Sequence, residues 1–266
     1  MRKKAKKSLG QNFLVSKNHI EKIILAVNPQ PEDLILEIGP GRGAITKSLV
    51  ESGARVIAVE LDSDLAGFLQ KEFSERKNFS VIHADILDVK LCGLLYKKAK
   101  VVGNLPYYVS TAILQKIVRE KDFILDCTFM FQKEVADRIL AQPKNKQRGF
   151  LTVIAQTFLF VEKIFEVPPF AFRPVPKVWS SVVKAIPKEE SDIEIERFFD
   201  FVGKCFSQKR KTLFNNLRGL DLIDLAQLEQ ILETVEINKT QRAEALTNEE
   251  WKKLFLAFEK ALKAKP

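Results

Sequence analysis

The segment Asn104–Tyr107 combines a carboxamide, a proline that fixes the backbone and an aromatic ring, directly after a short apolar run. This combination suits a site that holds a flat ring bearing an amine. The exocyclic amine of adenine is a poor nucleophile because its lone pair is delocalised into the ring. The Asn104 side chain and a nearby main-chain carbonyl could accept hydrogen bonds from both N–H groups and stabilise the positive charge that develops on nitrogen. Tyr107 could stack on the face of the base.

Asn and Pro also mark ordinary turns, so the motif alone leaves both interpretations open. The upstream sequence favours the functional one. Leu34–Ile38 is predicted to be a fully buried strand, which runs into the glycine-rich segment Gly39–Gly43 and then a helix, Ala44–Ser52. Strand, glycine-rich turn and helix form the first unit of a nucleotide-binding α/β domain. The spacing is G-x-G-x-G rather than G-x-G-x-x-G, so NAD fits less well.

Polar or glycine residues follow four consecutive predicted strands. The second strand, Val56–Val59, ends at Glu60, an acid about 20 residues past the glycines, where ribose hydroxyls are commonly bound. The third, Ser80–His83, is followed by Asp85, and the fourth ends at Asn104. Each acid taken singly could be a solvated loop residue. Because open α/β sheets bind ligands at the carboxyl ends of their strands, the repetition predicts one shared site.

With these residues in view, the chain resembles S-adenosylmethionine-dependent methyltransferases that act on adenine N6. The fuller resemblance is to the rRNA adenine N6,N6-dimethyltransferase family, and within it to the group that modifies small-subunit (16S) rRNA. It extends in order from residue 8 to about residue 250. The motifs that carry it are Leu9-Gly10-Gln11-Asn12-Phe13-Leu14, Glu37-Ile38-Gly39-Pro40-Gly41, Val102-Gly103-Asn104-Leu105-Pro106-Tyr107, Gln132-Lys133-Glu134-Val135, Phe172-Arg173-Pro174-Val175-Pro176-Lys177-Val178 and Gln208-Lys209-Arg210-Lys211-Thr212-Leu213.

The resemblance implies a set of contacts to S-adenosylmethionine, whose product is S-adenosylhomocysteine. An amino-terminal segment would close over the cofactor, the glycine loop would approach its methionine part, and acidic residues would bind its ribose and its adenine. In chain order these residues are Asn12 and Leu14, then Gly39 and Gly41, then Glu60 for the ribose, Asp85 for the adenine amino group with Ile86 beside that ring, and Asn104.

The same resemblance implies how the target base is held. Asn104, with Leu105 and Pro106 of its motif, would contact the adenine, and Phe172 would be a second aromatic face opposite Tyr107. Two positions depart from the family pattern. Tyr108 and Trp179 stand where relatives often carry polar residues, which puts RNA contacts at these positions in doubt rather than the chemistry.

The implied activity is transfer of two methyl groups to each of two adjacent adenosines near the 3′ end of small-subunit rRNA, on an immature 30S subunit. No general base is required, since the methylated amine can lose its proton to solvent. One alternative is a large-subunit rRNA methyltransferase of the Erm type, against which Gln208–Thr212 and Arg242–Leu246 argue. Another is a non-catalytic ribosome-assembly or transcription factor on the same fold. A NAD-dependent dehydrogenase is more distant.

Composition predicts a cytoplasmic globular protein, and a monomer is expected. Of the 266 residues, 46% are hydrophobic and 29% charged, and no apolar run approaches the ~20 residues of a membrane helix. The basic amino terminus lacks the apolar region of a secretory signal. Three cysteines without paired spacing indicate ordinary buried thiols in a reducing compartment. Two histidines exclude a histidine-rich metal site, and no metal is expected.

The net charge of +9 predicts a polyanionic partner, whose phosphates would make binding dependent on salt. Basic and acidic residues balance within 191–266, so the excess lies in 1–190. A solvated tail or turn is the alternative interpretation of each basic cluster. The candidate RNA-binding residues are Lys3, Lys4, Lys6 and Lys7 in the tail, and Lys209, Arg210 and Lys211 further on.

Alternating strands and helices predict a doubly wound α/β fold. The resemblance implies that its sheet is Rossmann-like and of the class I methyltransferase type. We expect a catalytic domain over 1–190, with a basic tail at 1–8, and a smaller helical domain for rRNA recognition over 191–266. The boundary follows from a polar, proline-initiated linker. The remaining predicted strands are Cys127–Phe131, Glu162–Val167 and Ser181–Ile186, of which the last two should form an antiparallel hairpin at one edge of the sheet.

The predicted helices of the first domain are Lys17–Val27, Ser63–Ser74, Ser110–Arg119, Lys133–Ala141 and Phe150–Phe158, and those of the second are Glu194–Phe206, Lys211–Arg218, Leu225–Val235 and Asn248–Leu262. Ser63 and Ser110 are expected to be N-caps, and Thr247 with Glu250 to form a capping box. The aromatic cluster Phe198, Phe199, Phe201 and Phe206 is expected to be core rather than an RNA platform.

Overall fold

The computed structural model describes residues 11–189, 192–219 and 223–263. The chain divides into two compact units. The first extends to Ala136 and includes Phe160–Pro187, and the second consists of Asp137–Leu159 and the chain from Lys188 onward. The segment Asp137–Leu159, which was expected in the catalytic domain, is thus part of the second unit. Its helix α7 (Phe150–Phe158) is apolar on almost every side, and it packs against helices of that unit.

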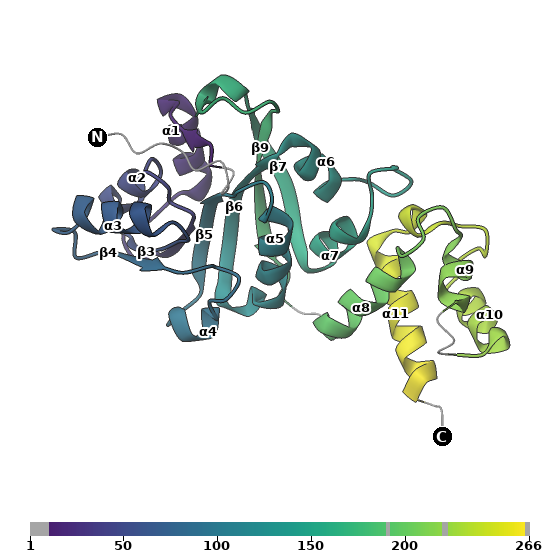
Figure 1. Cartoon of the computed structure of the whole chain (residues 1–266). Coiled ribbons are helices and arrows are strands. Elements are labelled where there is room, and N and C mark those ends of the chain that lie inside the picture. The colour runs from purple at the N-terminus through teal and green to yellow at the C-terminus, as the bar shows by residue number, and fades with distance from the viewer. Residues whose placement is uncertain (1–10, 190–191, 220–222, 264–266) are drawn as a thin grey trace. The chain divides into compact units, whose positions relative to one another are not determined.

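The first unit is built on a seven-stranded sheet with the order β4-β3-β2-β5-β6-β9-β7 (Figure 1). The strands from β4 to β6 pair in parallel, β9 runs antiparallel to β6, and β7 lies beside β9 at the edge. The predicted α/β fold is therefore confirmed. The bounds are β2 (Leu34–Ile38), β3 (Arg55–Glu60), β4 (Phe79–His83), β5 (Ala99–Asn104), β6 (Ile124–Gln132), β7 (Leu159–Val167) and β9 (Ser180–Pro187).

Apolar sequence explains why the central strands form. All five residues of β2 are buried, and five of the six residues of β5 are, as expected for parallel strands covered on both faces. Because β2, β3, β4 and β5 are parallel neighbours, their carboxyl ends lie along one edge of the sheet. The helices of this unit are α1 (Lys17–Val27), α2 (Thr46–Glu51), α3 (Ser63–Glu72), α4 (Leu91–Leu94), α5 (Ser110–Arg119) and the start of α6 (Lys133–Ile139), with short 3-10 turns at Lys121–Phe123 and Pro169–Ala171.

A second, two-stranded sheet was not predicted. In it β1 (Phe13–Leu14) pairs antiparallel with β8 (Phe172–Arg173), and Leu14 lies opposite Phe172. Two residues carry no periodicity that could reveal a strand. The pairing is reinforced by Val15, whose N–H donates to the Ala171 carbonyl at 2.8 Å. It fixes the amino-terminal segment beside the carboxyl ends of the large sheet.

Two of the three predicted helix caps were wrong. Asp62, not Ser63, is the N-cap of α3, where its carboxylate accepts from the Asp64 N–H. Val109 precedes α5, so Ser110 is the first helical residue, and its hydroxyl donates to the Tyr107 carbonyl instead. The capping box of the last helix is confirmed. The Thr247 hydroxyl accepts from the Glu250 N–H at 3.1 Å, and the Glu250 carboxylate accepts from the Thr247 N–H at 2.6 Å.

The second unit is helical, with an aromatic core. Phe198 and Phe199 are buried and meet the α7 side chains Phe158 and Phe150 edge to face. Phe201 is buried and Phe206 stacks on the buried Trp251, so the predicted core role of the phenylalanine cluster is confirmed. Besides α7, the helices are α8 (Ile195–Cys205), α9 (Leu213–Arg218), α10 (Leu225–Thr234) and α11 (Asn248–Lys263), with a 3-10 turn at Ala243–Ala245.

Arg148 is the largest buried charge in this unit, with none of its surface exposed. Its guanidinium donates to two main-chain carbonyls, those of Ala141 and Leu246, and to the side-chain oxygens of Gln156 and Asn248, at 2.6–3.1 Å. These partners come from segments about a hundred residues apart in the chain. Arg148 therefore joins Asp137–Leu159 to the carboxyl-terminal helices.

We expect Arg148→Met to lower the free energy of unfolding by about 2–3 kcal/mol, because it leaves buried acceptors without a donor. Chemical denaturation measures the change. Arg218→Met, at an exposed position of the same unit, should change stability by less than about 0.5 kcal/mol. Equal stability of the two variants would contradict the assigned role.

The cysteines were expected to be ordinary buried thiols. Cys127 and Cys205 are buried free thiols, but Cys92 is exposed, so the expectation of buried thiols fails at that position. Cys92 lies in the four-residue helix α4, which is too short to bury all its sides.

Within the described ranges, no helix has both the length and the apolar character needed to cross a bilayer.

Candidate active site

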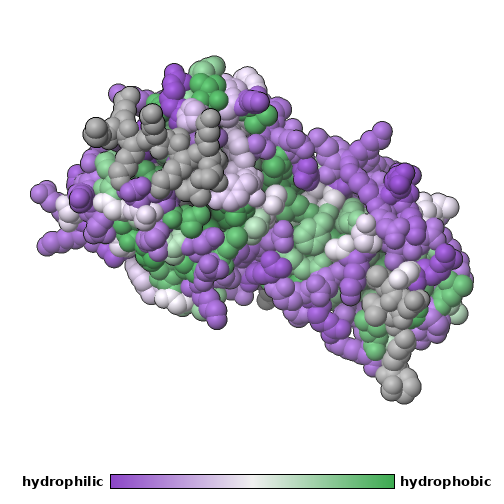
Figure 2. Space-filling model, in the orientation of Figure 1, coloured by the Kyte–Doolittle hydropathy of each residue, from purple (hydrophilic) through white to green (hydrophobic). Residues whose placement is uncertain are grey.

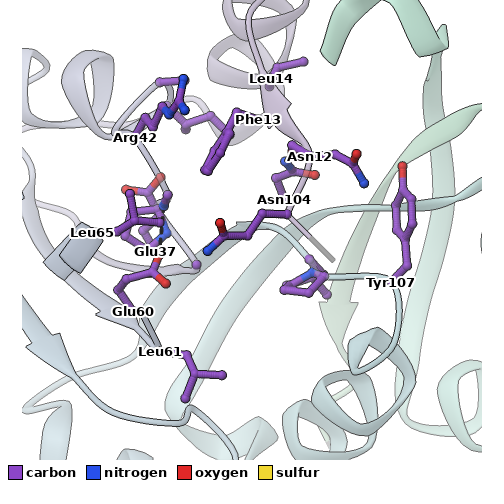
Figure 3. A pocket seen from close by; sticks show the side chains of 18 of the residues that line it. Asn12, Phe13, Leu14, Glu37, Arg42, Glu60, Leu61, Leu65, Asn104 and Tyr107 are labelled. Carbon is purple, nitrogen blue, oxygen red and sulfur yellow. Dashed lines mark hydrogen bonds between the residues drawn. The ribbon is translucent and has the colours of Figure 1, made fainter. Parts of the chain in front are cut away.

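A cavity opens at the carboxyl ends of the central strands, where the predicted site residues were expected to meet (Figure 3). Its wall is formed by the amino-terminal segment, the glycine loop after β2, the end of β3 and the turn after β5. In the close view Asn104 lies between the acidic pair Glu37 and Glu60 on one side and Tyr107 on the other. The predicted residues that line it are Asn12, Leu14, Gly39, Gly41, Glu60, Asn104, Leu105, Pro106 and Tyr107.

The glycine loop needs its glycines for two different reasons. Gly39 and Gly41 have φ of 65° and 59°, in the left-handed region that other residues rarely adopt. A side chain at Gly39 would enter open space, with no atom within 4 Å of its Cβ. At Gly41 a Cβ would lie 3.2 Å from the ring of Phe13. The backbone of Gly39 is therefore open to a ligand, and Gly41 lets Phe13 pack against the loop.

Glu60 presents a fixed carboxylate to the cavity. One oxygen accepts from the Gly41 N–H at 3.0 Å and the other from the Asp62 N–H at 2.9 Å. Burial raises the pKa of Glu60, and these hydrogen bonds oppose that rise. Each carboxylate oxygen has a further lone pair, so Glu60 can still accept from hydroxyl groups of a ligand.

Glu37 is a second acid in the cavity wall, and it was not predicted to have a role beyond its motif. It is 2% exposed, its Oε2 has no hydrogen-bond partner, and burial raises its pKa to about 7. The nearby Glu60 carboxylate contributes to the same rise. A charged residue inside the apolar strand Leu34–Ile38 was the signal that could have identified it.

The raised pKa of Glu37 predicts a loss of stability as the pH rises. The folded protein holds this proton more tightly than the unfolded chain, whose glutamate pKa is about 4.5. The contribution is present below pH 4.5 and is lost as the pH rises through about 7. Between pH 5 and pH 8 this loss lowers the free energy of unfolding by about 2–3 kcal/mol. Glu37→Gln should remove that part of the pH dependence in denaturation experiments, and Glu75→Gln, at an exposed position, should not.

Asn104 is oriented by the amino-terminal segment. Its Nδ2 donates to the main-chain carbonyl of Asn12 at 3.0 Å. That bond fixes which end of the carboxamide is nitrogen, and it leaves Oδ1 as an acceptor. Among the residues that the structure describes, no hydrogen bond reaches Oδ1, so the oxygen can accept from an amine in the cavity.

Tyr107 is held at both ends. Its backbone follows Pro106, and its hydroxyl lies 3.0 Å from the Ser180 Oγ at the start of β9. The ring is half-buried, and burial raises the pKa of its hydroxyl. The ring can therefore stack on a flat ligand in a fixed orientation.

The structure does not place Phe172 opposite Tyr107. Its side chain is fully buried in a hydrophobic cluster with Leu14 and Ala171, and it does not line the cavity. The cause is the β1–β8 pairing, which turns this residue into the core. The predicted second aromatic face is thus not met in this structure.

Asp85 and Ile86 also lie outside the cavity wall. The carboxylate of Asp85 accepts from the Leu87 N–H at 2.9 Å, and Ile86 is buried. They follow β4, which neighbours β3 and Glu60 in the sheet. Their predicted contact with a cofactor adenine stays a prediction.

The predicted RNA-binding residues fall into two groups. Lys3, Lys4, Lys6 and Lys7 lie outside the described residues. Lys209, Arg210 and Lys211 are exposed in the loop between α8 and α9 of the second unit. Several cavity residues were not predicted as site residues: Gln11, Phe13, Glu37, Pro40, Arg42, Ala44, Ile45, Leu61, Leu65 and Tyr108.

Comparison with known proteins adds three findings. The model of the family described as "Ribosomal RNA adenine dimethylase" matches residues 2–260. A protein of Clostridium botulinum named "Ribosomal RNA small subunit methyltransferase A" is 42% identical over 94% of this chain and 93% of its own length. Among solved structures, a dimethyladenosine transferase from Plasmodium falciparum is 28% identical, with a TM-score of 0.80 over 94% of this chain and 98% of its own.

The 23S rRNA methyltransferase ErmE is similar as well. It is 26% identical, with a TM-score of 0.71 over 93% of this chain and all of its own. The predicted fold, a class I methyltransferase sheet with a helical carboxyl-terminal region, agrees with both solved structures.

Proposed function

Because the chain belongs to the ribosomal RNA adenine dimethylase family, we propose that it dimethylates N6 of two adjacent adenosines near the 3′ end of small-subunit rRNA. It is an S-adenosylmethionine-dependent methyltransferase of rRNA adenine. The small-subunit assignment is supported by the similarity to small subunit methyltransferase A, which covers nearly the whole of both chains. The observation that carries the chemistry is the orientation of Asn104, with Oδ1 left as an acceptor.

The cavity fits S-adenosylmethionine by its chemistry. The Glu60 carboxylate is fixed by two main-chain N–H groups and can accept from ribose hydroxyls, and the open face of Gly39 admits close approach. Glu37 provides a buried carboxylate with an unused oxygen. When bound, the cofactor supplies an activated methyl group with a sulfonium leaving group.

The residues of this chain position the adenine amine and stabilise its developing charge. Asn104 Oδ1 accepts a hydrogen bond from the amine, and an oxygen acceptor stabilises the positive charge that grows on nitrogen during methylation. Tyr107, tethered to Ser180, provides the stacking face. Among the described residues that line the cavity, none is a histidine or lysine. The methylated amine is acidic enough to lose its proton to solvent, so no general base is required.

We further assign rRNA recognition to the second unit, through the exposed loop residues Lys209, Arg210 and Lys211. Phosphate contacts of this kind predict an affinity that falls as salt rises. The immature 30S subunit is the proposed partner, the cytoplasm the proposed location, and a monomer the proposed active form.

Methyl incorporation with labelled cofactor tests this function. We expect labelled N6,N6-dimethyladenosine in immature small subunits and none in naked large-subunit rRNA. Label confined to large-subunit rRNA would transfer the assignment to the Erm type, whose solved member ErmE has the same fold. Absence of S-adenosylmethionine binding in calorimetry would instead indicate a non-catalytic assembly factor.

A further inference from the structure

Large apolar side chains are concentrated at the surface of the segment Phe170–Trp179, between β7 and β9. Of the 17 large hydrophobic residues that are exposed in the described part of the chain, four lie in these ten positions: Phe170, Val175, Val178 and Trp179. Figure 2 shows hydrophobic surface over this loop, at the top of the view. A contiguous apolar patch on a protein surface commonly marks an interaction site.

The segment is held beside the cavity at two points. In its first half Arg173 pairs with Phe13, which lines the cavity. At the other end the Trp179 carbonyl accepts from the Lys133 N–H at 2.9 Å, and the next residue, Ser180, holds the hydroxyl of Tyr107. Trp179 therefore stands on a rigid backbone, one residue from the contact that positions the stacking tyrosine.

A second exposed aromatic residue is also one position away from the contact between Tyr107 and Ser180, and the rim is defined as Tyr108 and Trp179. Tyr108 follows Tyr107, lines the cavity, and leaves 59% of its surface exposed, while Trp179 leaves 48%. Tyr107 is half-buried and tethered, so it serves the base inside the cavity. Tyr108 and Trp179 are free to contact what lies immediately outside it.

The charges around these rings fit a nucleic acid. Arg173 and Lys177 are exposed on the same segment, and the whole chain carries a net charge of +9. Exposed aromatic rings interleaved with cations are the usual composition of a surface for single-stranded RNA, in which bases stack and phosphates are neutralised.

We propose that Tyr108 and Trp179 stack on unpaired nucleotides that flank the target adenosine. The proposal rests on the proposed function, since it assumes that the cavity holds an adenosine of RNA. An adenine that leaves its stack to enter the cavity exposes the faces of its neighbours, and aromatic rings at the rim compensate for that loss.

Tryptophan fluorescence offers a direct readout. The chain has two tryptophans, and Trp251 is fully buried in the second unit. Quenching on titration with a single-stranded oligoadenylate RNA should therefore report Trp179. By fluorescence anisotropy of a labelled RNA, we expect Trp179→Leu to weaken RNA affinity about tenfold or more, and Tyr108→Leu to weaken it by a similar factor. Trp179→Phe, which keeps a ring, should retain most of the affinity.

Tyr96→Leu is the matched control. Tyr96 is 73% exposed and lies just before the amino-terminal end of β5, whereas the cavity lies at the carboxyl end of that strand. Its replacement should therefore leave RNA affinity unchanged. Thermal unfolding midpoints close to that of the wild type would show that all the variants fold. The proposal would be overturned if Trp179→Leu bound RNA as tightly as the wild type. It would also be overturned if this variant lost affinity for whole subunits but not for naked RNA. Neither result affects the proposed function, which fails only if the wild type methylates no small-subunit adenosine.

Discussion

Asn104→Ala is expected to lower the rate of methyl transfer about 100- to 1,000-fold, with little change in the free energy of unfolding. The side chain is part-exposed in the cavity, so its removal leaves no packing defect. What is lost is an oxygen acceptor aimed at charge that exists only as the nitrogen is methylated, and losing one such group typically has an effect of this size. Single-turnover transfer from labelled cofactor measures it.

A second substitution separates the two functions of this carboxamide. Asn104→Asp keeps an oxygen acceptor but removes the Nδ2 donor that binds the Asn12 carbonyl. We expect its rate to lie between those of the wild type and Asn104→Ala. Rates near wild type in Asn104→Ala would refute the acceptor role, and equal rates in the two variants would mean that holding the amino-terminal segment is the main contribution.

The sequence predicted the large sheet and the site at its edge because both depend on local patterns. Apolar runs such as Leu34–Ile38 specify buried parallel strands, and the residues just beyond those runs must lie together once the strands are parallel. Gly39, Glu60 and Asn104 could therefore be assigned to one cavity from the sequence alone.

Features that depend on distant segments could not be predicted. The β1–β8 pairing joins residues about 160 positions apart through two-residue strands, and it buries Phe172, for which the family resemblance implied a stacking role. The position of α7 in the second unit depends in the same way on Arg148 and its partners near residue 247. No local pattern contains these contacts.

Glu37 illustrates a different limit. Its position in a strand was predicted, but the consequence of burying a carboxylate next to Glu60 depends on three-dimensional surroundings, which raise its pKa to about 7. Buried acids are rare unless paired. Two buried acids in one cavity wall lower the stability of the fold. They also give the cavity an acidic surface, which suits a cationic ligand such as a sulfonium that carries a free amino group.

Glu60→Ala is expected to weaken S-adenosylmethionine binding about 100-fold or more, while RNA affinity changes by less than about twofold. The carboxylate lies at the end of β3 and its oxygens are held by the Gly41 and Asp62 N–H groups. Each hydrogen bond from a ribose hydroxyl to such a charged acceptor contributes about 1.5–3 kcal/mol, so the loss of two accounts for the expected change. Calorimetric titration with cofactor, and with RNA separately, measures both affinities.

The substitution also removes an acceptor from the glycine loop, so a milder variant is needed to interpret it. Glu60→Gln keeps one carbonyl oxygen for Gly41 or Asp62 and loses the charge, and we expect an intermediate cofactor affinity. Asp85→Ala tests the other predicted acid, which lies outside the cavity wall, and it should weaken binding less than Glu60→Ala. Equal losses of cofactor and RNA affinity in Glu60→Ala would count against the ribose role, because a general collapse of the loop would affect both ligands, whereas a missing acceptor affects only the one that it binds.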